Sequence, residues 1–174
     1  MEYIQVDIRS HRDVLVDLNE EYLNWIVEQV MEHYGLDISA QAPDGMTIRQ
    51  YAEKSIEDVL DLAPPTGICY LLREEEEVVG MGAVREVRPG VCEIKRMYIR
   101  PGYRGRGIGK GLFHRLLDRG REFGFARAYL ETGRFMTVAQ KMYRSAGFVE
   151  RSEYAETEVP PEMRDIWMFM EKDL

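Results

Sequence analysis

Hydrophobic positions recur along the chain with two different periods, which separate predicted strands from predicted helices. Apolar and polar residues alternate over residues 3–9, and this pattern predicts a short strand. Over residues 14–35 the apolar positions recur three and four apart and end at a glycine, as in a long helix. Residues 47–62 begin with Thr47, a good cap, and predict a second helix, with a loop at residues 41–45 before it.

Three apolar segments at residues 68–74, 77–87 and 91–99 follow, and an acidic turn separates the first two. Consecutive strands with short turns predict an antiparallel meander. Within the third segment, Cys92 and Ile94 lie in one phase of the alternation, whereas Met97 and Ile99 lie in the other. A β-bulge re-aims side chains in this way, so we predict a bulge in the third strand.

The last third of the chain alternates between helical and extended patterns. We predict helices at residues 108–123 and 137–147, and strands at residues 126–132, 148–156 and 165–174. No linker rich in proline, glycine or serine divides the 174 residues, of which 45% are hydrophobic. The sequence therefore predicts a single α+β domain spanning residues 1–174.

Charge is distributed unevenly along this acidic chain. The formal net charge is -8, yet residues 95–121 contain nine Lys or Arg and one acid, Asp118. A protein of this overall charge without a basic and aromatic pattern is a poor candidate for nucleic-acid binding. The local excess of cations instead suggests a small anionic ligand.

Cysteine, histidine and hydropathy patterns narrow the class of protein further. Cys69 and Cys92 lie within strand-like apolar segments, which favours buried thiols over a disulfide, and the three histidines show no zinc spacing. We expect no metal site. The first ten residues are charged and alternating, and no 18-residue apolar run occurs, so we expect a cytoplasmic protein with no membrane contact.

Glycines and cations concentrate where the predicted strand 91–99 leads into the helix at 108–123. A Walker loop fails here because Arg104 and Gly111 occupy positions that need Gly and Ser/Thr. A dinucleotide-binding fingerprint fails because Lys110 or Leu112 replaces its third glycine. The remaining pattern is R-x-x-G-x-G from Arg104 to Gly109, opening a helix. Glycines and free amide groups at a helix start suit a pyrophosphate.

This pattern resembles the acetyl-CoA loop of the GNAT superfamily of N-acetyltransferases, Q/R-x-x-G-x-G/A at a strand-to-helix junction. The segment CEIKRMYI is similar to the central strand of that family, and YRSAGF to its tyrosine-bearing helix. The resemblance covers about residues 68–149. It implies a mixed, mostly antiparallel sheet flanked by helices, whose fourth and fifth strands splay apart and admit the pantetheine arm.

The resemblance also implies which residues bind acetyl-CoA. Backbone N–H groups of the loop would hold the pyrophosphate, and the side chains of Arg104, Arg106 and Lys110 would add positive charge. Main-chain groups on the preceding strand would contact the pantetheine. The complete predicted set is Met97, Ile99, Arg104, Gly105, Arg106, Gly107, Ile108, Gly109 and Lys110.

Two residues are candidates for proton transfer. The resemblance implies that Tyr143 protonates the departing thiolate, although its helical spacing also fits a core tyrosine. Glu93 lies where one branch of the family has its general base, and a surface glutamate is the alternative. Glu131 is a weaker substitute.

We therefore predict an N-acetyltransferase that moves the acetyl group of acetyl-CoA to a primary amine of a small molecule or peptide. The amine would attack directly in a ternary complex, because no Cys-His or Ser-His pair supports an acyl-enzyme. A non-catalytic acyl-CoA-binding or sensing domain is the alternative. Helical spacing favours core packing over acceptor binding for Tyr22, Trp25 and Tyr34. The resemblance also implies self-association into a homodimer.

Overall fold

The computed structural model describes residues 1–39, 45–60 and 62–174, so the loop predicted at residues 41–45 lies, except for Gly45, outside the described residues. In chain order the elements are β1 (Glu2–Gln5), α1 (Ile8–Tyr34), α2 (Ile48–Ser55), α3 (Glu57–Leu60), β2 (Gly67–Glu74), β3 (Glu77–Arg88), β4 (Val91–Ile99), η3 (Pro101–Tyr103), α4 (Ile108–Glu122), β5 (Arg127–Gly133), α5 (Thr137–Ser145), β6 (Val149–Arg151), η4 (Pro161–Ile166) and β7 (Trp167–Asp173).

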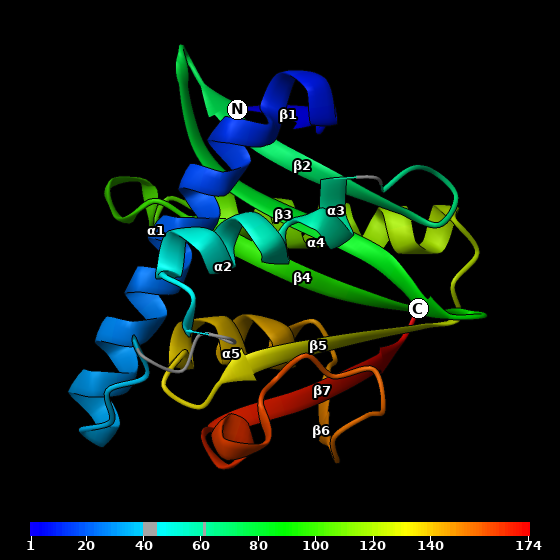
Figure 1. The fold of residues 1–174 in the computed structure, drawn as a ribbon. Coiled ribbons are helices and arrows are strands. Elements are labelled where there is room, and N and C mark those ends of the chain that lie inside the picture. Colours follow the sequence, from blue (N-terminus) through cyan, green and yellow to red (C-terminus); the bar gives the residue numbers. More distant parts are fainter. Residues whose placement is uncertain (40–44, 61) are drawn as a thin grey trace.

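A seven-stranded sheet with the order β1-β2-β3-β4-β5-β7-β6 forms the centre of the fold. Every neighbouring pair is antiparallel except β4 and β5, which run parallel. Helices α1, α2 and α3 cover one face, and α4 and α5 cover the other (Figure 1). The predicted mixed, mostly antiparallel sheet with flanking helices is confirmed.

Strands β4 and β5 pair over only four residues each. Val91 to Ile94 pair with Arg127 to Leu130, after which residues 95–99 and 131–133 have no partner in the opposite strand. The two strands diverge from this point (Figure 1). The predicted splay is therefore confirmed, and it leaves an opening in the middle of the sheet.

A β-bulge interrupts the β3–β4 ladder, as the sequence predicts. Neither Arg96 nor Met97 has a partner in β3, and Arg96 has φ 57°, in the left-handed region. The bulge changes the phase of the alternation. As a result, Met97 and Ile99 pack against the same hydrophobic cluster as Cys92 and Ile94.

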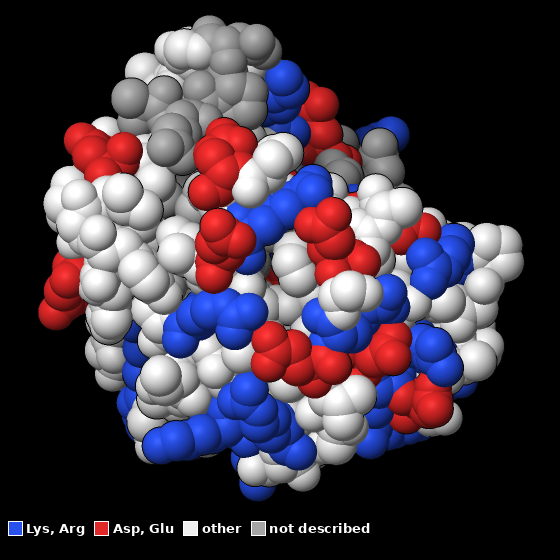
Figure 2. All heavy atoms as spheres, turned by 90° about the horizontal axis from the view of Figure 1, so that it is seen from below, with Lys and Arg blue, Asp and Glu red and all other residues white. Residues whose placement is uncertain are grey.

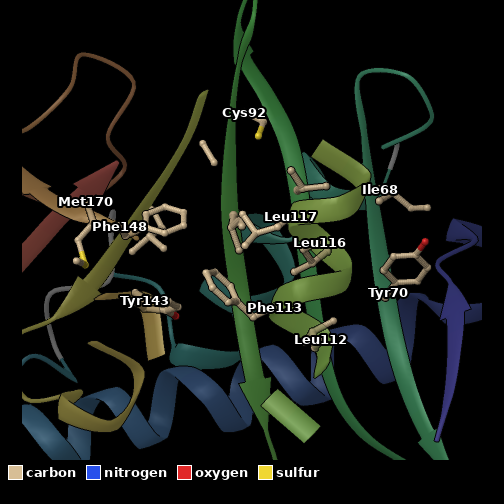
Figure 3. Packing of buried hydrophobic residues seen from close by; sticks show 14 of the residues in the cluster. Ile68, Tyr70, Cys92, Leu112, Phe113, Leu116, Leu117, Tyr143, Phe148 and Met170 are labelled. Atoms are coloured by element: carbon tan, nitrogen blue, oxygen red, sulfur yellow. The ribbon is translucent and has the colours of Figure 1, made fainter. Parts of the chain in front are cut away.

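Apolar side chains fill both faces of the sheet. On one face, α4 and α5 pack against the sheet through a cluster that includes Leu112, Phe113, Leu116 and Tyr143 (Figure 3). On the other face α1 contacts two clusters. Its first half packs with β2, β3 and β4 through Leu15, Val16 and Leu18, and its second half packs with β5 and β7 through Ile26 and Val30.

Local capping moves several predicted boundaries. The first strand ends at Gln5 rather than at residue 9, because the Asp7 carboxylate accepts a hydrogen bond from the Arg9 amide (2.8 Å) and starts α1. Thr47 caps the second helix in a capping box with Gln50, but that helix divides into α2 and α3. The strand predicted at residues 148–156 is limited to the three residues of β6.

Candidate active site

The glycine loop between η3 and α4 offers an open anion site. Gly105 and Gly107 adopt φ 75° and 80°, where side chains are disfavoured, and nothing lies within 4 Å of a Cβ built on either. Helix α4 begins after Gly107 without a side-chain cap. The first amide groups of a helix have no intrahelical acceptor, so they are free to bind an anion here. The loop therefore fits the pyrophosphate predicted for it.

Arg104 points away from this loop toward α1. Its Nε donates a hydrogen bond to the carbonyl oxygen of Ile99 (2.8 Å). Its guanidinium lies over the rings of Trp25 and Tyr98, 4.8 and 5.4 Å from their centroids. The side chain thus joins β4 and the loop to α1, and Trp25 packs against an arginine as well as against the core.

The other two predicted phosphate cations differ from each other. Arg106 forms two 2.8 Å hydrogen bonds with the Glu74 carboxylate, at the tip of the β2–β3 hairpin. Lys110, in the first turn of α4, makes no ion pair with any of the residues that the structure describes. Of the three side chains, Lys110 is the one whose charge is not already balanced by a neighbouring acid or held by an aromatic stack.

Tyr143 lies on α5 with its ring in the core beneath α4. The ring centroid is 5.0 Å from that of Phe113, and 7% of the residue is exposed (Figure 3). Burial, and then the charge of Tyr22, raise the pKa of Tyr143 above its ordinary value. The phenol is therefore protonated at neutral pH, and the same shift makes it a weaker acid than an exposed tyrosine.

A cavity of about 100 Å³ lies on the opposite face, where β4 and β5 separate. Lys95 and Glu131 line it. They are the first residues of β4 and β5 beyond the end of the pairing between these two strands. Tyr22 lines it from α1, and Trp167 lines it from the start of β7. Tyr22 thus faces the cavity in addition to packing against the core, whereas Tyr34 is 38% exposed at the end of α1.

Glu93 is buried in this cavity rather than on the surface. It is 3% exposed, and its Oε1 accepts a 2.6 Å hydrogen bond from the Tyr154 hydroxyl. Its Oε2 accepts from Arg85 Nε at 3.1 Å. Both carboxylate oxygens are therefore engaged by protein donors, and the surface-glutamate interpretation is wrong.

Glu131 has a different environment on the other side of the same cavity. Its Oε1 is buried and has no hydrogen-bond partner among the described residues. Burial, and then the charge of Glu93, raise the pKa of Glu131 to about 7, although the side chains of Thr157 and Tyr154 act in the opposite direction. A carboxylate of this pKa with a vacant oxygen is a suitable proton acceptor at neutral pH. The sequence favours Glu93 over Glu131 as the general base, because nothing in it reveals how the two side chains are hydrogen-bonded.

The family model described as acetyltransferase (GNAT) family matches residues 27–148. The chain belongs to the GNAT acetyltransferase family. It is accordingly an acyltransferase that uses an acyl-CoA, and the glycine loop of this GNAT protein lies within the matched region.

Curated relatives agree with this membership. The chain is 34% identical over 134 residues to an uncharacterized N-acetyltransferase of Escherichia coli, covering 75% of each chain. It is also 34% identical over 118 residues to a protein of Azospirillum brasilense named IAA acetyltransferase, covering 67% of this chain and 74% of the relative.

Solved structures share the fold of this GNAT protein along its length. A putative acyl-CoA N-acyltransferase from Klebsiella pneumoniae matches with a TM-score of 0.68 and 24% identity, covering 99% of this chain and 97% of that chain. A PaiA N-acetyltransferase from Thermoplasma acidophilum in complex with coenzyme A matches with a TM-score of 0.73 and 16% identity, covering 99% and 98%.

Two further findings concern the described residues of this GNAT protein. Within residues 1–39, 45–60 and 62–174, no helix combines the length and apolar character needed to span a bilayer, and no three acid, histidine or cysteine side chains gather as metal ligands. Cys69 and Cys92 are buried and form no disulfide, as predicted.

Proposed function

We propose that this enzyme transfers the acetyl group of acetyl-CoA to a primary amine by direct attack in a ternary complex. The amine nitrogen forms a bond to the acetyl carbon, and the bond between that carbon and the thioester sulfur breaks. One proton leaves the ammonium form of the acceptor before it attacks, and a second leaves the nitrogen once it is bonded to the acetyl carbon. The departing thiolate takes up one proton, so one proton is released to solvent overall. The proposal assigns removal of the first proton and protonation of the thiolate to residues on opposite faces of the sheet.

One arrangement carries the proposal: a protonated phenol lies on one face of the sheet, and a carboxylate with a buried oxygen lies on the other face, where β4 and β5 separate. Tyr143, whose raised pKa keeps it protonated, lies on the α5 face. Glu131, whose pKa is about 7, lies in the cavity on the α1 face. An acceptor amine entering from the cavity would meet the thioester between these two groups.

Glu131 is better placed than Glu93 to accept the proton from the acceptor. Glu93 already accepts hydrogen bonds from Tyr154 and Arg85 through its two oxygens. Glu131 retains a vacant oxygen, and the charge of Glu93 makes Glu131 more basic. In this proposal Glu93 is a positioning residue that raises the pKa of Glu131.

For the cosubstrate, the proposal combines the loop with the bulged strand. Gly105 and Gly107 let the backbone approach the pyrophosphate, and Lys110 supplies positive charge. Met97 lies outside both strand ladders, so its main-chain groups are available to the pantetheine arm. The Ile99 carbonyl already accepts from Arg104 and contributes less to this contact.

A thiol-release assay with acetyl-CoA and a panel of primary amines tests the function. We expect amine-dependent release of coenzyme A, together with an acetylated amine detected by mass spectrometry. Binding of acetyl-CoA without release for any amine would contradict the proposal and favour an acyl-CoA-binding or sensing domain.

We further propose a cytoplasmic location and a homodimer. Cys69 and Cys92 are buried and form no disulfide, which suits a reducing compartment. Strands β1 and β6 form the two edges of the sheet and offer backbone groups for pairing. Light scattering behind size exclusion tests the dimer, and a monomer mass at working concentration would contradict it.

A further inference from the structure

Four charged side chains form a closed network at the mouth of the cavity. Lys95 Nζ lies 2.8 and 2.9 Å from the two carboxylate oxygens of Glu158. The same carboxylate accepts a 2.6 Å hydrogen bond from Arg85. Arg85 in turn lies 3.0 Å from the Glu93 carboxylate, and Lys95 lies 3.9 Å from it. Two cations therefore share two acids.

The members of this network differ in how deeply they are buried and in the kind of backbone segment that carries them. The side chains of Arg85, Lys95 and Glu93 are 16%, 10% and 4% exposed and belong to the central strands β3 and β4. Glu158 is 47% exposed and comes from the irregular segment 152–160 between β6 and η4. The buried part of the network consists of two cations and one acid, and Glu158 is its outer, exposed member.

A cation held away from water is stabilised by an anion beside it, because desolvated charge is costly. Lys95 and Arg85 lower the pKa of Glu158 below its ordinary value although burial acts in the opposite direction. Their position thus favours a carboxylate in its charged form. Any other carboxylate reaching this point would find the same two cations.

The site lies beside the proposed chemistry. The pairing between β4 and β5 ends at Ile94 and Leu130, and Lys95 and Glu131 are the next residues of the two strands. Both side chains line the same cavity together with Glu158. An acceptor whose amine approaches Glu131 therefore extends its nearby substituents toward Lys95 and Arg85.

We propose that the acceptor amine carries a carboxylate, as an amino acid or a related zwitterion does, and that this carboxylate replaces Glu158 on Lys95 and Arg85. This inference rests on the proposed acetyl transfer to an amine. The exchange conserves charge, since one carboxylate leaves the two cations and another takes its place. Glu158 moves into solvent with the irregular segment that carries it.

A polyamine acceptor fits this surface less well. Its second ammonium group would approach Lys95 and Arg85, which repel it at short range. Lys95 and Arg96 line the cavity beside its three acids, and blue and red residues are likewise interleaved on the face shown in Figure 2. The network thus favours an acceptor with charges of both signs.

Matched acceptors test the proposal. Phenylalanine, phenylalaninamide and phenethylamine share the ring and the primary amine, but only the first has a carboxylate. Rates are compared at equal concentrations of the unprotonated amine. We expect kcat/KM for phenylalanine to exceed that for either neutral compound about tenfold, the size of one charge-assisted hydrogen bond. Leucine and leucinamide repeat the comparison with another side chain.

Substitutions then identify which residues produce the preference for an acceptor with a carboxylate. Lys95→Gln should lower the ratio of kcat/KM between acid and amide about tenfold, because it removes a cation that holds the carboxylate. Glu158→Gln should raise the same ratio, because the internal competitor loses its charge. Glu156→Gln is the matched control: Glu156 belongs to the same segment, pairs with Arg88 at 2.8 Å and does not line the cavity. It should keep the parent ratio.

The outcomes separate the inference from the proposed function. Turnover of neutral amines with no preference for the acids, and no change in the ratio for Glu158→Gln, would overturn the inference and leave acetyl transfer intact. Absence of turnover with every amine would overturn the proposed function. Melting temperatures measured with coenzyme A and each compound then test the inference alone. It requires phenylalanine to raise the melting temperature more than its amide does, and this difference should be larger in Glu158→Gln. Equal shifts for the acid and the amide would overturn it.

Discussion

Tyr143 on α5 and Tyr22 on α1 lie near enough for the ionisation of one to affect the pKa of the other, although their helices cover opposite faces of the sheet. The charge that Tyr22 would carry on ionisation raises the pKa of Tyr143, and Tyr22 itself has its pKa raised to about 12, mainly by burial. The sheet lies between α5 and α1, and its strands β4 and β5 are not paired with each other beyond Ile94 and Leu130. In the proposed function, the cosubstrate and the acceptor approach each other at this place.

The first prediction concerns the proton donor. Tyr143→Phe retains the ring that packs on Phe113 and removes only the hydroxyl. If that hydroxyl protonates the thiolate, kcat should fall about a hundredfold, toward the lower end for general acid catalysis because a thiolate leaves readily. Acetyl-CoA affinity and melting temperature should change little. Tyr34→Phe, on the exposed end of α1, serves as the control. An unchanged kcat would exclude Tyr143 as the acid.

A second prediction distinguishes Glu131 from Glu93 by the dependence of kcat/KM on pH. In the parent, kcat/KM should rise with pH and level off above about pH 7, where Glu131 becomes charged. Because the charge of Glu93 raises this pKa, Glu93→Gln should move the inflection to lower pH while retaining it. Glu131→Gln should abolish the inflection and reduce the rate more at pH 7.5 than at pH 9.5, where more acceptor is already unprotonated. The reverse assignment of the two profiles would make Glu93 the base.

Glu131 should also make the stability of the fold depend on pH. Its pKa rises from an ordinary 4.5 to about 7 on folding, so its contribution to stability is fully present below about pH 4.5 and is lost as the pH rises through 7. At pH 8 the loss amounts to about 3 kcal/mol. Glu131→Gln should therefore gain stability relative to the parent as the pH rises from 4.5 to 8 in urea titrations. Glu150→Gln, at a half-exposed position, is the control. A pH-independent difference would contradict the buried, raised pKa.

The role of the glycine loop in binding acetyl-CoA is tested with two glycines that have nearly the same positive φ. Gly107 and Gly90 have φ 80° and 79°, and neither has an atom within 4 Å of a built Cβ. Alanine at either position adds the same backbone strain. Acetyl-CoA should raise the melting temperature of the parent, by the equivalent of about 2.7 kcal/mol at a hundredfold excess over Kd. Gly107→Ala should weaken this shift, whereas Gly90→Ala, in the β3–β4 turn, should retain it. Equal shifts would remove the loop from the cosubstrate site.

Much of the fold follows from local sequence signals. The R-x-x-G-x-G loop, the change of phase between Ile94 and Met97, and Thr47 as a cap each act through neighbouring residues, and all three appear in the structure at the predicted places. The splay of β4 and β5 is predicted only by the resemblance to the GNAT superfamily, because no local sequence pattern indicates it. The alternating pattern predicts a first strand that is four residues too long, because Asp7 fits a polar position of a strand as well as the cap of a helix.

The chemistry of the site depends on contacts between distant segments, which a single sequence does not reveal. Glu93 and Glu131 both lie in strand-like segments, but one is held by Tyr154, 61 residues away, and the other retains a vacant oxygen. Arg104 fits the phosphate pattern, yet its side chain stacks on Trp25 of the first helix. Glu158 lies in a stretch without periodicity, so no sequence signal pointed to its contact with Lys95.

The short pairing between β4 and β5 has a mechanical consequence. Four residue pairs hold the two strands together, and beyond them the two parts of the sheet are joined through side chains of α1 on one face and of α4 and α5 on the other. The opening can therefore change width by small adjustments of side-chain packing, without breaking a backbone hydrogen bond between these strands. Coenzyme A inserted there would bridge the two parts and restrict this motion. Amide hydrogen exchange at residues 95–99 and 131–133 should slow when it binds, whereas equal exchange rates with and without it would show that the opening is already rigid.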